Sequence, residues 1–154
     1  MLKLRKNKKG FTLVELIVVI AIMAVLAGTV AGVTVSQLNK QTDKSNENQA
    51  RTLAGSISSY IVDNIAMADS NNKVSAAMQA AIGENYGSLT IAYDTDPTNS
   101  GDFYVKYIPA NKCLEVGYKK KSTGKANTKV CYVSDSGLVS TDLPGASGGE
   151  EDGE

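Results

Sequence analysis

An uncharged apolar run near the amino terminus constrains this chain more than any other feature. The run extends from Leu16 to Val35, twenty residues without a single Asp, Glu, Lys or Arg. At about 1.5 Å per residue, a helix of this length matches the roughly 30 Å hydrocarbon core of a bilayer. The sequence therefore predicts a membrane-spanning helix. One carboxylate, Glu15, lies at its start, and a bilayer tolerates such a charge only when a partner neutralises it.

The distribution of charge predicts how this helix is oriented. Of the 16 Lys and Arg residues, 5 precede Gly10, which leaves 11 basic against 16 acidic residues in the rest of the chain, a net charge of −5. These five residues are Lys3, Arg5, Lys6, Lys8 and Lys9. Because basic residues flank membrane helices on the cytoplasmic side, we expect everything after Val35 to lie on the outer side.

A cleaved secretory signal is the alternative interpretation of the same pattern. The apolar run is longer than the usual core of such signals, which has about 7–15 residues. The triplet Ala27-Gly28-Thr29 resembles a cleavage site, but apolar residues resume at Val30. The pattern therefore favours a helix that is retained.

The residues at the junction between the basic leader and the apolar run form a specific motif. They read Lys9-Gly10-Phe11-Thr12-Leu13-Val14-Glu15-Leu16. This segment resembles the prepilin processing motif of the type IV pilin superfamily, in which a glycine ends a short basic leader. The resemblance implies that residues 1–10 are a leader peptide, that a prepilin peptidase cleaves between Gly10 and Phe11, and that the new amine of Phe11 is methylated. The chain would then be a substrate of this processing and not an enzyme.

The resemblance also implies a role for Glu15. In the family, this carboxylate of a subunit in the membrane meets the Phe11 amine of its neighbour at the growing end of a filament. The residues alone leave two alternatives open, an ion pair within one chain and a charge that reaches the membrane edge, because Glu15 lies near the helix start. The implied partners are other copies of the chain, minor pilins, the pilus assembly platform with its ATPase, and the membrane before assembly.

Gly28 and Gly32 form a pair of small residues spaced by four within the apolar run. Such pairs lie on one helix face and allow two helix backbones to approach closely, which suits a filament core. The alternative is that both are ordinary glycines of a membrane helix. Many members of the family carry a helix-kinking proline at the position of Gly32, and glycine encodes such local melting less strongly.

The helix is predicted to continue past the apolar run. Residues 11–35 form its membrane-spanning part, and residues 36–69 form an amphipathic part with a surface ion pair between Glu47 and Arg51. Its apolar face, with steps of three and four residues, comprises Leu53, Ala54, Ile57, Ile61, Ile65 and Ala68. Polar residues Ser70-Asn71-Asn72 are predicted to end it, and a short second helix is predicted from Val74 to Ile82.

Alternating apolar residues predict a sheet in the remaining chain. The alternating sets are Leu89, Ile91, Tyr93, then Phe103, Val105, Tyr107, then Leu114, Val116, Tyr118, with a last candidate over Lys129 to Val133. We expect three or four antiparallel strands in a globular α/β region over residues 70–143, followed by a flexible acidic tail over residues 144–154. The predicted class is α+β, with the long helix packed on this sheet as in the pilin fold.

The two cysteines predict a disulfide. Cys113 and Cys131 would lie in an oxidising setting outside the cell, where a bridge is permitted. If they faced each other on antiparallel strands, Leu114 would oppose Val130 and both apolar sets would point to one side. Redox catalysis is disfavoured because the spacing is not Cys-x-x-Cys.

Other polar residues give no strong sign of a chemical site. Asp94, Asp96 and Asp102 supply oxygen ligands in one loop, but the order of residues departs from calcium loops and favours a plain turn. The chain has no histidine, which removes histidine triads and histidine zinc sites. We therefore predict neither a cofactor nor a resident metal.

The basic residues after the leader give no footprint for strong nucleic-acid binding. They make one local group, Lys119, Lys120, Lys121 and Lys125, which is predicted to be a solvated turn. The sequence as a whole predicts a structural subunit of a type IV pilus, serving adhesion, motility or DNA uptake. Its precursor would be a single-pass membrane protein and its mature form part of an extracellular filament. The alternatives are a pseudopilin of a secretion or competence apparatus, and a membrane-tethered adhesin or sensor that keeps its leader.

Overall fold

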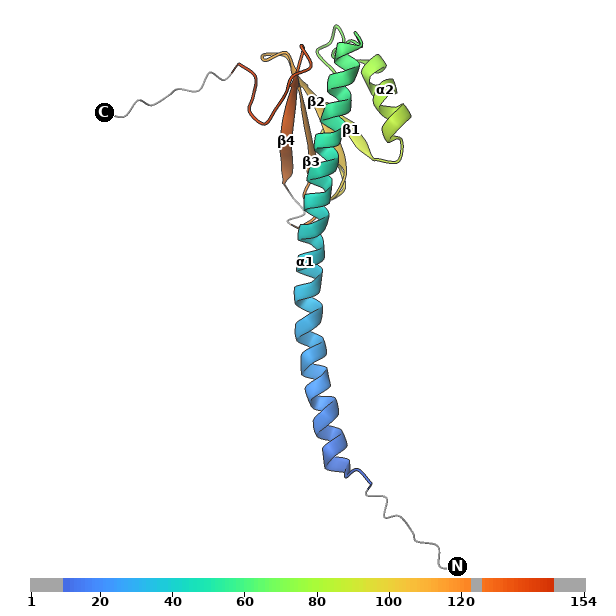
Figure 1. The fold of residues 1–154 in the computed structure, drawn as a ribbon, viewed down its shortest axis with the longest axis vertical. Helices are drawn as coiled ribbons and strands as arrows, with labels where there is room; N and C mark the ends of the chain where they lie inside the picture. Colours follow the sequence, from blue (N-terminus) through green and yellow to red (C-terminus); the bar gives the residue numbers. More distant parts are fainter. Residues whose placement is uncertain (1–9, 123–125, 146–154) are drawn as a thin grey trace, which may run out of the picture. The chain divides into compact units, whose positions relative to one another are not determined.

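The computed structural model describes residues 10–122 and 126–145, with residues 31 and 32 described by their backbone alone. Two compact units divide the chain, one up to Leu38 and one from Asn39 onward. The elements in chain order are α1 (Leu13–Val62), α2 (Ala76–Tyr86), β1 (Ile91–Tyr93), β2 (Phe103–Ile108), β3 (Cys113–Lys119), β4 (Asn127–Ser134) and β5 (Val139–Ser140) (Figure 1). We call the described part of the second unit, residues 39–145, the head.

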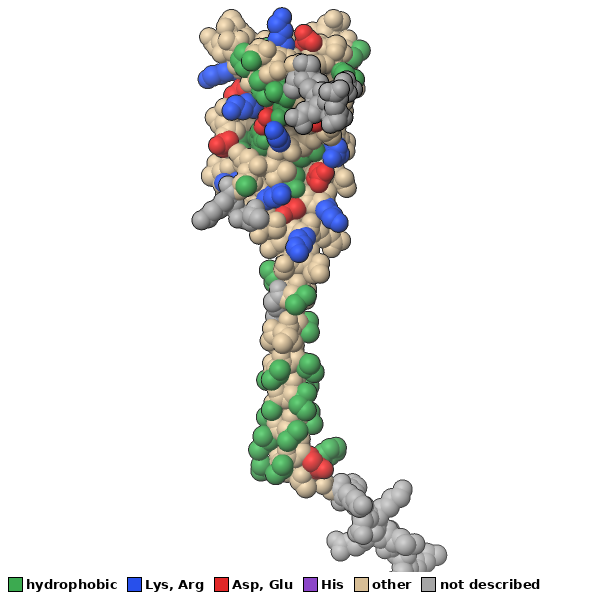
Figure 2. Space-filling view, turned by 90° about the vertical axis from the view of Figure 1, so that its left-hand side faces the viewer, with side chains coloured by type: hydrophobic (Ala, Val, Ile, Leu, Met, Phe, Trp, Pro, Cys, Tyr) green, Lys and Arg blue, Asp and Glu red, His purple; other side chains and the backbone are tan. Residues whose placement is uncertain are grey.

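The described part of the first unit is mainly the amino-terminal part of α1, and its described apolar side chains have no cover from the described chain. Every described side chain from Leu13 to Leu38 is exposed, and the large apolar ones keep at least 50% of their surface open. Figure 2 shows such side chains along this part of the helix. The helix is long and apolar enough to cross a membrane. A helix that is apolar all round needs lipid or other helices around it.

The head is built on one apolar core between α1 and the sheet. Residues Ala50, Leu53, Ala54 and Ile57 of α1 are fully buried, which confirms the amphipathic face predicted from steps of three and four residues. Figure 1 shows this part of α1 lying along the sheet, with α2 beside it. The buried partners of these α1 residues are Val74, which precedes α2, and the following residues of α2 and the sheet: Met78, Ile82, Phe103, Val105, Leu114, Val116, Tyr118, Val130, Cys131 and Val133.

The sheet has five strands in the order β1-β2-β3-β4-β5. Strands β2 to β5 pair antiparallel, and β1 pairs parallel with β2. The α+β class is confirmed, with one long helix packed on a mostly antiparallel sheet. The two-residue strand β5 and the parallel pairing of β1 were not predicted. A strand of two residues is too short to produce an alternating pattern in sequence.

Helix α1 ends at Val62 and not at Asp69, so the predicted end of the amphipathic part was wrong. Asn64 has φ of 65°, and its N–H bonds the carbonyl of Ile61 while that of Ile65 bonds the carbonyl of Tyr60. These two bonds form a Schellman motif around a left-handed residue, which is a common way to end a helix. The apolar spacing continued past this stop because Ile65 still packs on the core.

Helix α2 is displaced from its predicted range of Val74 to Ile82. The Ser75 hydroxyl accepts a hydrogen bond from the Met78 N–H at 3.1 Å, which makes Ser75 the N-cap and begins the helix at Ala76. Gly83, which follows the predicted range directly, lies inside the helix. A single glycine lowers helix stability by about 1 kcal/mol, which packing against the core offsets.

Candidate processing and assembly site

The junction between Gly10 and Phe11 lies immediately before α1 in non-helical backbone. The Phe11 side chain is 89% exposed. No heavy atom lies within 4 Å of the position that a Cβ would take at Gly10. The peptide bond predicted to be cleaved is therefore open to an approaching enzyme in the described part of the chain.

Thr12 and Glu15 start the helix together. The Thr12 N–H and hydroxyl both donate to Glu15 Oε2 at 2.8 Å, and the Glu15 N–H donates back to the Thr12 hydroxyl at 3.3 Å. The first helical hydrogen bond runs from the Leu16 N–H to the Thr12 carbonyl at 3.2 Å. This arrangement is a capping box, in which an N-cap hydroxyl and a carboxylate three residues later satisfy each other's backbone donors.

This capping box was not predicted from the sequence. Its sequence signal is Thr-x-x-Glu before an apolar run, and Thr12-Leu13-Val14-Glu15 matches it. It gives Glu15 a polar partner in its own chain. A carboxylate at the first turn is also favoured by the positive end of the helix dipole. Its neutralisation by the Phe11 amine of another copy stays a prediction, because residue 11 carries an amide in the uncleaved chain.

The predicted pair of small residues lies on α1 within the first unit. A Cβ added at Gly28 would meet nothing within 4 Å, so this face is open to a neighbour. Gly32 belongs to the same helix, but its surroundings lie outside the described residues. Two hydroxyls nearby are satisfied by their own helix, since Thr29 donates to the Leu26 carbonyl at 3.0 Å and Thr34 to the Val30 carbonyl at 2.8 Å. They therefore add no unpaired polar group to the apolar surface.

The two cysteines do not form the predicted bridge. Both are buried and free. Cys113 pairs with Ser134 and Cys131 with Val116, so the two cysteines are three positions apart along β3 and lie on opposite faces of the sheet. The predicted opposition of Leu114 and Val130 was wrong for the same reason, since Leu114 pairs with Val133.

The sheet register has a physical explanation. The observed pairing lays Leu114 and Val116 against Val133 and Cys131 on the core face, so all four side chains are buried. A bulge between Val116 and Gly117 then shifts the register by one residue. The extra residue of this bulge is Val130 of β4, which is apolar like its neighbours, so the sequence pattern did not reveal it.

The three aspartates of the predicted loop are used separately. Asp94 accepts hydrogen bonds from the N–H groups of Val74 and Tyr107 at 2.7 and 2.9 Å. Asp96 accepts from the Asn127 amide at 2.8 Å, and Asp102 accepts from the Asn99 N–H at 3.1 Å. Within the described ranges no three metal-ligating side chains come together. Asp94 and Asp96 therefore hold the loop to its neighbours, and Asp102 bonds within it.

A cation of the chain itself lies against this loop. The Lys119 ammonium donates to the carbonyls of Pro97 and Thr98 at 3.2 and 3.0 Å. The backbone of Lys119 exchanges two further hydrogen bonds with the loop, from the Gly101 N–H and to the Asp102 carbonyl. Lys119 is therefore occupied and only part of the predicted basic turn is solvated. Lys125 lies outside the described residues.

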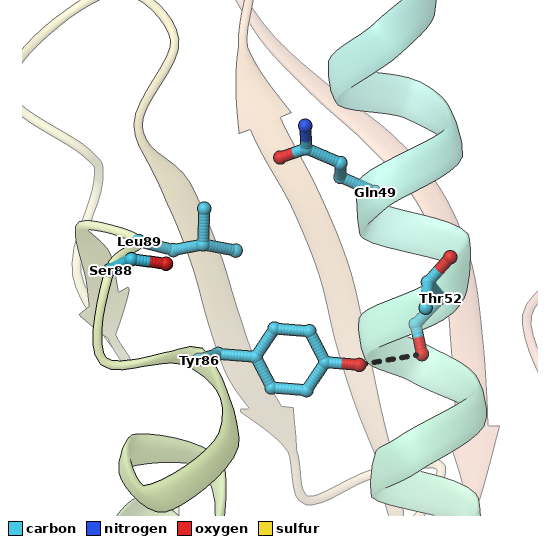
Figure 3. Close-up of a pocket in the computed structure, with 5 residues that line it drawn as sticks. All are labelled: Gln49, Thr52, Tyr86, Ser88 and Leu89. Carbon is cyan, nitrogen blue, oxygen red and sulfur yellow. Dashed lines mark hydrogen bonds between the residues drawn. The ribbon is translucent and has the colours of Figure 1, made fainter.

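A hollow of about 310 Å³ lies between α1 and the connection from α2 to β1 (Figure 3). Gln49 and Thr52 line it from α1, and Tyr86, Ser88 and Leu89 from the other side. The Tyr86 hydroxyl bonds the Thr52 carbonyl at 3.4 Å and the Ser56 hydroxyl at 2.7 Å. These contacts tie α2 to α1. The residues that line the hollow include no carboxylate, amine or thiol.

Comparison with known proteins identifies the amino-terminal segment. Residues 5–31 match the family model described as the prokaryotic N-terminal methylation motif. No curated protein and no solved structure matches the chain. The matched residues include Gly10, Phe11, Glu15 and Gly28, together with the first turns of α1. The family with this motif consists of structural subunits, and the motif implies cleavage by a prepilin peptidase and assembly into pilus-like filaments. The amino-terminal segment of this chain carries the type IV prepilin signature.

Proposed function

We propose that this chain is the structural subunit of a type IV pilus. The precursor is inserted in the cell membrane with residues 1–10 in the cytoplasm, cleaved after Gly10, and methylated on the amine of Phe11. The mature subunit then polymerises into an extracellular filament that serves adhesion, motility or DNA uptake. The observation that carries this proposal is the signature at residues 5–31 joined to an apolar helix whose described side chains between Leu13 and Leu38 are exposed.

The exposed helix needs two environments in succession. Each fully buried apolar side chain of this size contributes about 1.5–3 kcal/mol relative to leaving it in water. Lipid supplies the burial before assembly, and helices of other copies supply it in the filament. Gly28 and Gly32 let neighbouring helices approach closely, because small residues allow close backbone contact.

Glu15 links the precursor to the filament. Glu15 Oε2 accepts both capping hydrogen bonds from Thr12. Within the described chain, Oε1 is therefore available to accept a hydrogen bond from the Phe11 amine of a neighbouring copy. A charge-assisted hydrogen bond of this kind is stronger than a neutral one. The chain would then use one carboxylate both to start its own helix and to set the axial position of the next copy. The further partners are minor pilins and the assembly platform with its ATPase.

Electron microscopy of sheared surface filaments tests this function. Cells with the gene deleted are expected to lose one class of filament, and the wild-type copy restores it. Glu15→Gln keeps the shape of the side chain and removes its charge, so we expect processing to continue and filament yield to fall. The matched control is Glu84→Gln, on the exposed surface of α2 in the head, which should leave yield unchanged. Filaments of normal number and appearance in the deletion strain would contradict the proposal.

A further inference from the structure

We propose that a basic collar on the head of one subunit binds the acidic tail of the next subunit in the filament. The basic collar comprises Lys40 and Lys44 of α1 and Lys120 and Lys121 of the connection after β3. The acidic tail is residues 144–154. This inference rests on the proposed function, because it requires neighbouring copies in a filament.

The basic collar is held together by one buried carboxylate. Asp43 is 7% exposed and accepts hydrogen bonds from the N–H groups of Lys121 and Ser122 at 2.7 and 3.1 Å. These bonds fix the connection after β3 against α1. They bring Lys120 and Lys121 to the same part of the head as Lys40 and Lys44, which flank Asp43 on the helix.

The collar keeps a surplus of positive charge. It carries four ammonium groups, and Asp43, the carboxylate bonded within it, accepts from the backbone N–H groups of Lys121 and Ser122 and not from any of these ammonium groups. Lys40, Lys44 and Lys121 are exposed, and Lys120 is half-buried. Lys119 is not counted because its ammonium is held by the carbonyls of Pro97 and Thr98. Figure 2 shows Lys or Arg side chains gathered at the lower end of the head, with acidic ones among them.

The acidic tail has a matching number of charges. It contains Glu150, Glu151, Asp152 and Glu154 and no basic residue. Its beginning is fixed to the head, since the Asn111 amide donates to the Pro144 carbonyl at 2.6 Å. Asn111 lies in the turn between β2 and β3. The tail therefore leaves the head at the start of β3, whereas the collar lies just past the end of β3.

The length of the tail favours the collar of another copy over its own. Strand β3 has 7 residues, which separates its two ends by about 20 Å. Glu150 follows Gly145 by five residues and reaches at most about 17 Å from it. By backbone length Glu150 therefore stops short of the far end of β3, and only the acids after it can reach that end. When heads follow one another in the same orientation, the end with the tail of one copy comes next to the collar end of the following copy. Such a head-to-tail contact repeats along a filament without closing.

Anionic lipid is a less suitable occupant of the collar. Negative surface potential is a property of the cytoplasmic leaflet, whereas the head is proposed to lie on the outer side. The tail supplies four carboxylates within five positions, from residue 150 to residue 154. Its local concentration in a filament is high because every subunit carries one tail.

Carbodiimide crosslinking of sheared filaments tests the contact. This reagent joins a carboxylate and an amine that are already in contact. One allele carries Lys40→Gln, Lys44→Gln, Lys120→Gln and Lys121→Gln with its tail intact, and a second carries Glu150→Gln, Glu151→Gln, Asp152→Asn and Glu154→Gln with its collar intact. In filaments from cells that express both alleles, only a contact between copies can join tail to collar. We expect mass spectrometry to find these crosslinks in wild-type and mixed filaments, and their loss in filaments of either allele alone.

The controls separate the other outcomes. Lys106→Gln with Lys129→Gln removes two exposed amines from β2 and β4, and should leave collar crosslinks unchanged. Crosslinks in wild-type but not in mixed filaments would mean that a tail binds its own collar, which overturns the proposal. Filaments with no crosslink overturn the contact alone, and collar-dependent binding of the full chain to phosphatidylglycerol vesicles would then assign the collar to lipid. Absence of the chain from every filament fraction would overturn the proposed function as well.

Discussion

At the scale of single residues, the capping box changes how the acidic residue in the apolar run is understood. Glu15 bonds both the N–H and the hydroxyl of Thr12, so the carboxylate has a partner before any second subunit is present. A helix start leaves backbone N–H groups without partners, and in a membrane each such group is costly. Thr12 and Glu15 therefore belong to one structural unit, and each is needed for the geometry of the other.

Thr12→Val is expected to weaken the start of α1, because valine has the shape of threonine without the hydroxyl. Loss of an N-cap costs about 1 kcal/mol. Hydrogen exchange of the full chain in detergent should show faster exchange in the first turn. Thr29→Val is the matched control, since the Thr29 hydroxyl bonds only the Leu26 carbonyl of its own helix. Equal exchange in the two variants would show that the capping box contributes nothing.

The two thiols give a second prediction at this scale. Burial raises the pKa of Cys131 to about 11, with the nearby Arg51 opposing it, and burial followed by the charge of Glu115 raises the pKa of Cys113. Because the thiolate is the reactive form, both should react slowly with a thiol reagent in the folded chain. Unfolding without reductant should release two reactive thiols. Finding none after unfolding would mean that a disulfide exists after all.

At the scale of elements, the sequence predicts the structure correctly where apolar residues recur at a regular spacing. It fails at the ends of elements and in the register of strand pairing. The buried face of α1 and the alternating residues of β2 and β3 follow from spacing alone, because burial selects one side. The end of α1 depends on Asn64 in a left-handed conformation, and the register of β3 on β4 depends on a bulge at Gly117. Neither leaves a periodic signal. In the candidate site, Gly10, Phe11 and Glu15 were identified by motif, whereas the capping contact needed geometry.

Gly117 is predicted to be the glycine least tolerant of change in the head. A Cβ at this position would lie 2.3 Å from the Thr128 carbonyl oxygen and 2.7 Å from the Tyr104 ring. Gly117→Ala should lower the free energy of unfolding by about 1–3 kcal/mol, the usual range for overpacking. Urea denaturation of the full chain in detergent measures it. The control Gly83→Ala, with nothing within 4 Å, should be neutral or stabilising. Equal stabilities would contradict the close packing at the bulge.

The attachment of the connection after β3 to α1 is predicted to depend on pH. Burial raises the pKa of Asp43, but hydrogen bonds from Ser122 and Lys121 and the charge of Lys120 outweigh burial and lower it below its ordinary value. A carboxyl with a lowered pKa adds stability that is fully present above the unfolded value of about 3.9 and is lost as pH falls through the folded pKa. Wild-type stability should therefore fall more steeply below about pH 4 than that of Asp43→Asn. Identical pH profiles in urea denaturation would contradict this role.

At the scale of the whole molecule, the two units have different requirements. The head buries its own apolar residues, from Ala50 of α1 to Val133 of β4. The described apolar residues of the first unit have no such cover from the described chain, and the same segment carries the prepilin methylation signature. The apolar surface of the first unit is therefore buried only when lipid or other copies of the chain surround it. The proposed filament assembly would meet this requirement and would give the proposed cleavage after Gly10 a purpose.

Mass spectrometry of the subunit in sheared surface filaments tests this account most directly. We predict that the filament fraction contains the chain with methylated Phe11 as its first residue. The membrane fraction of cells without prepilin peptidase should contain the same chain with residues 1–10 still attached. A filament fraction without the chain, or a surface form that retains residues 1–10 in cells with an active peptidase, would contradict the account.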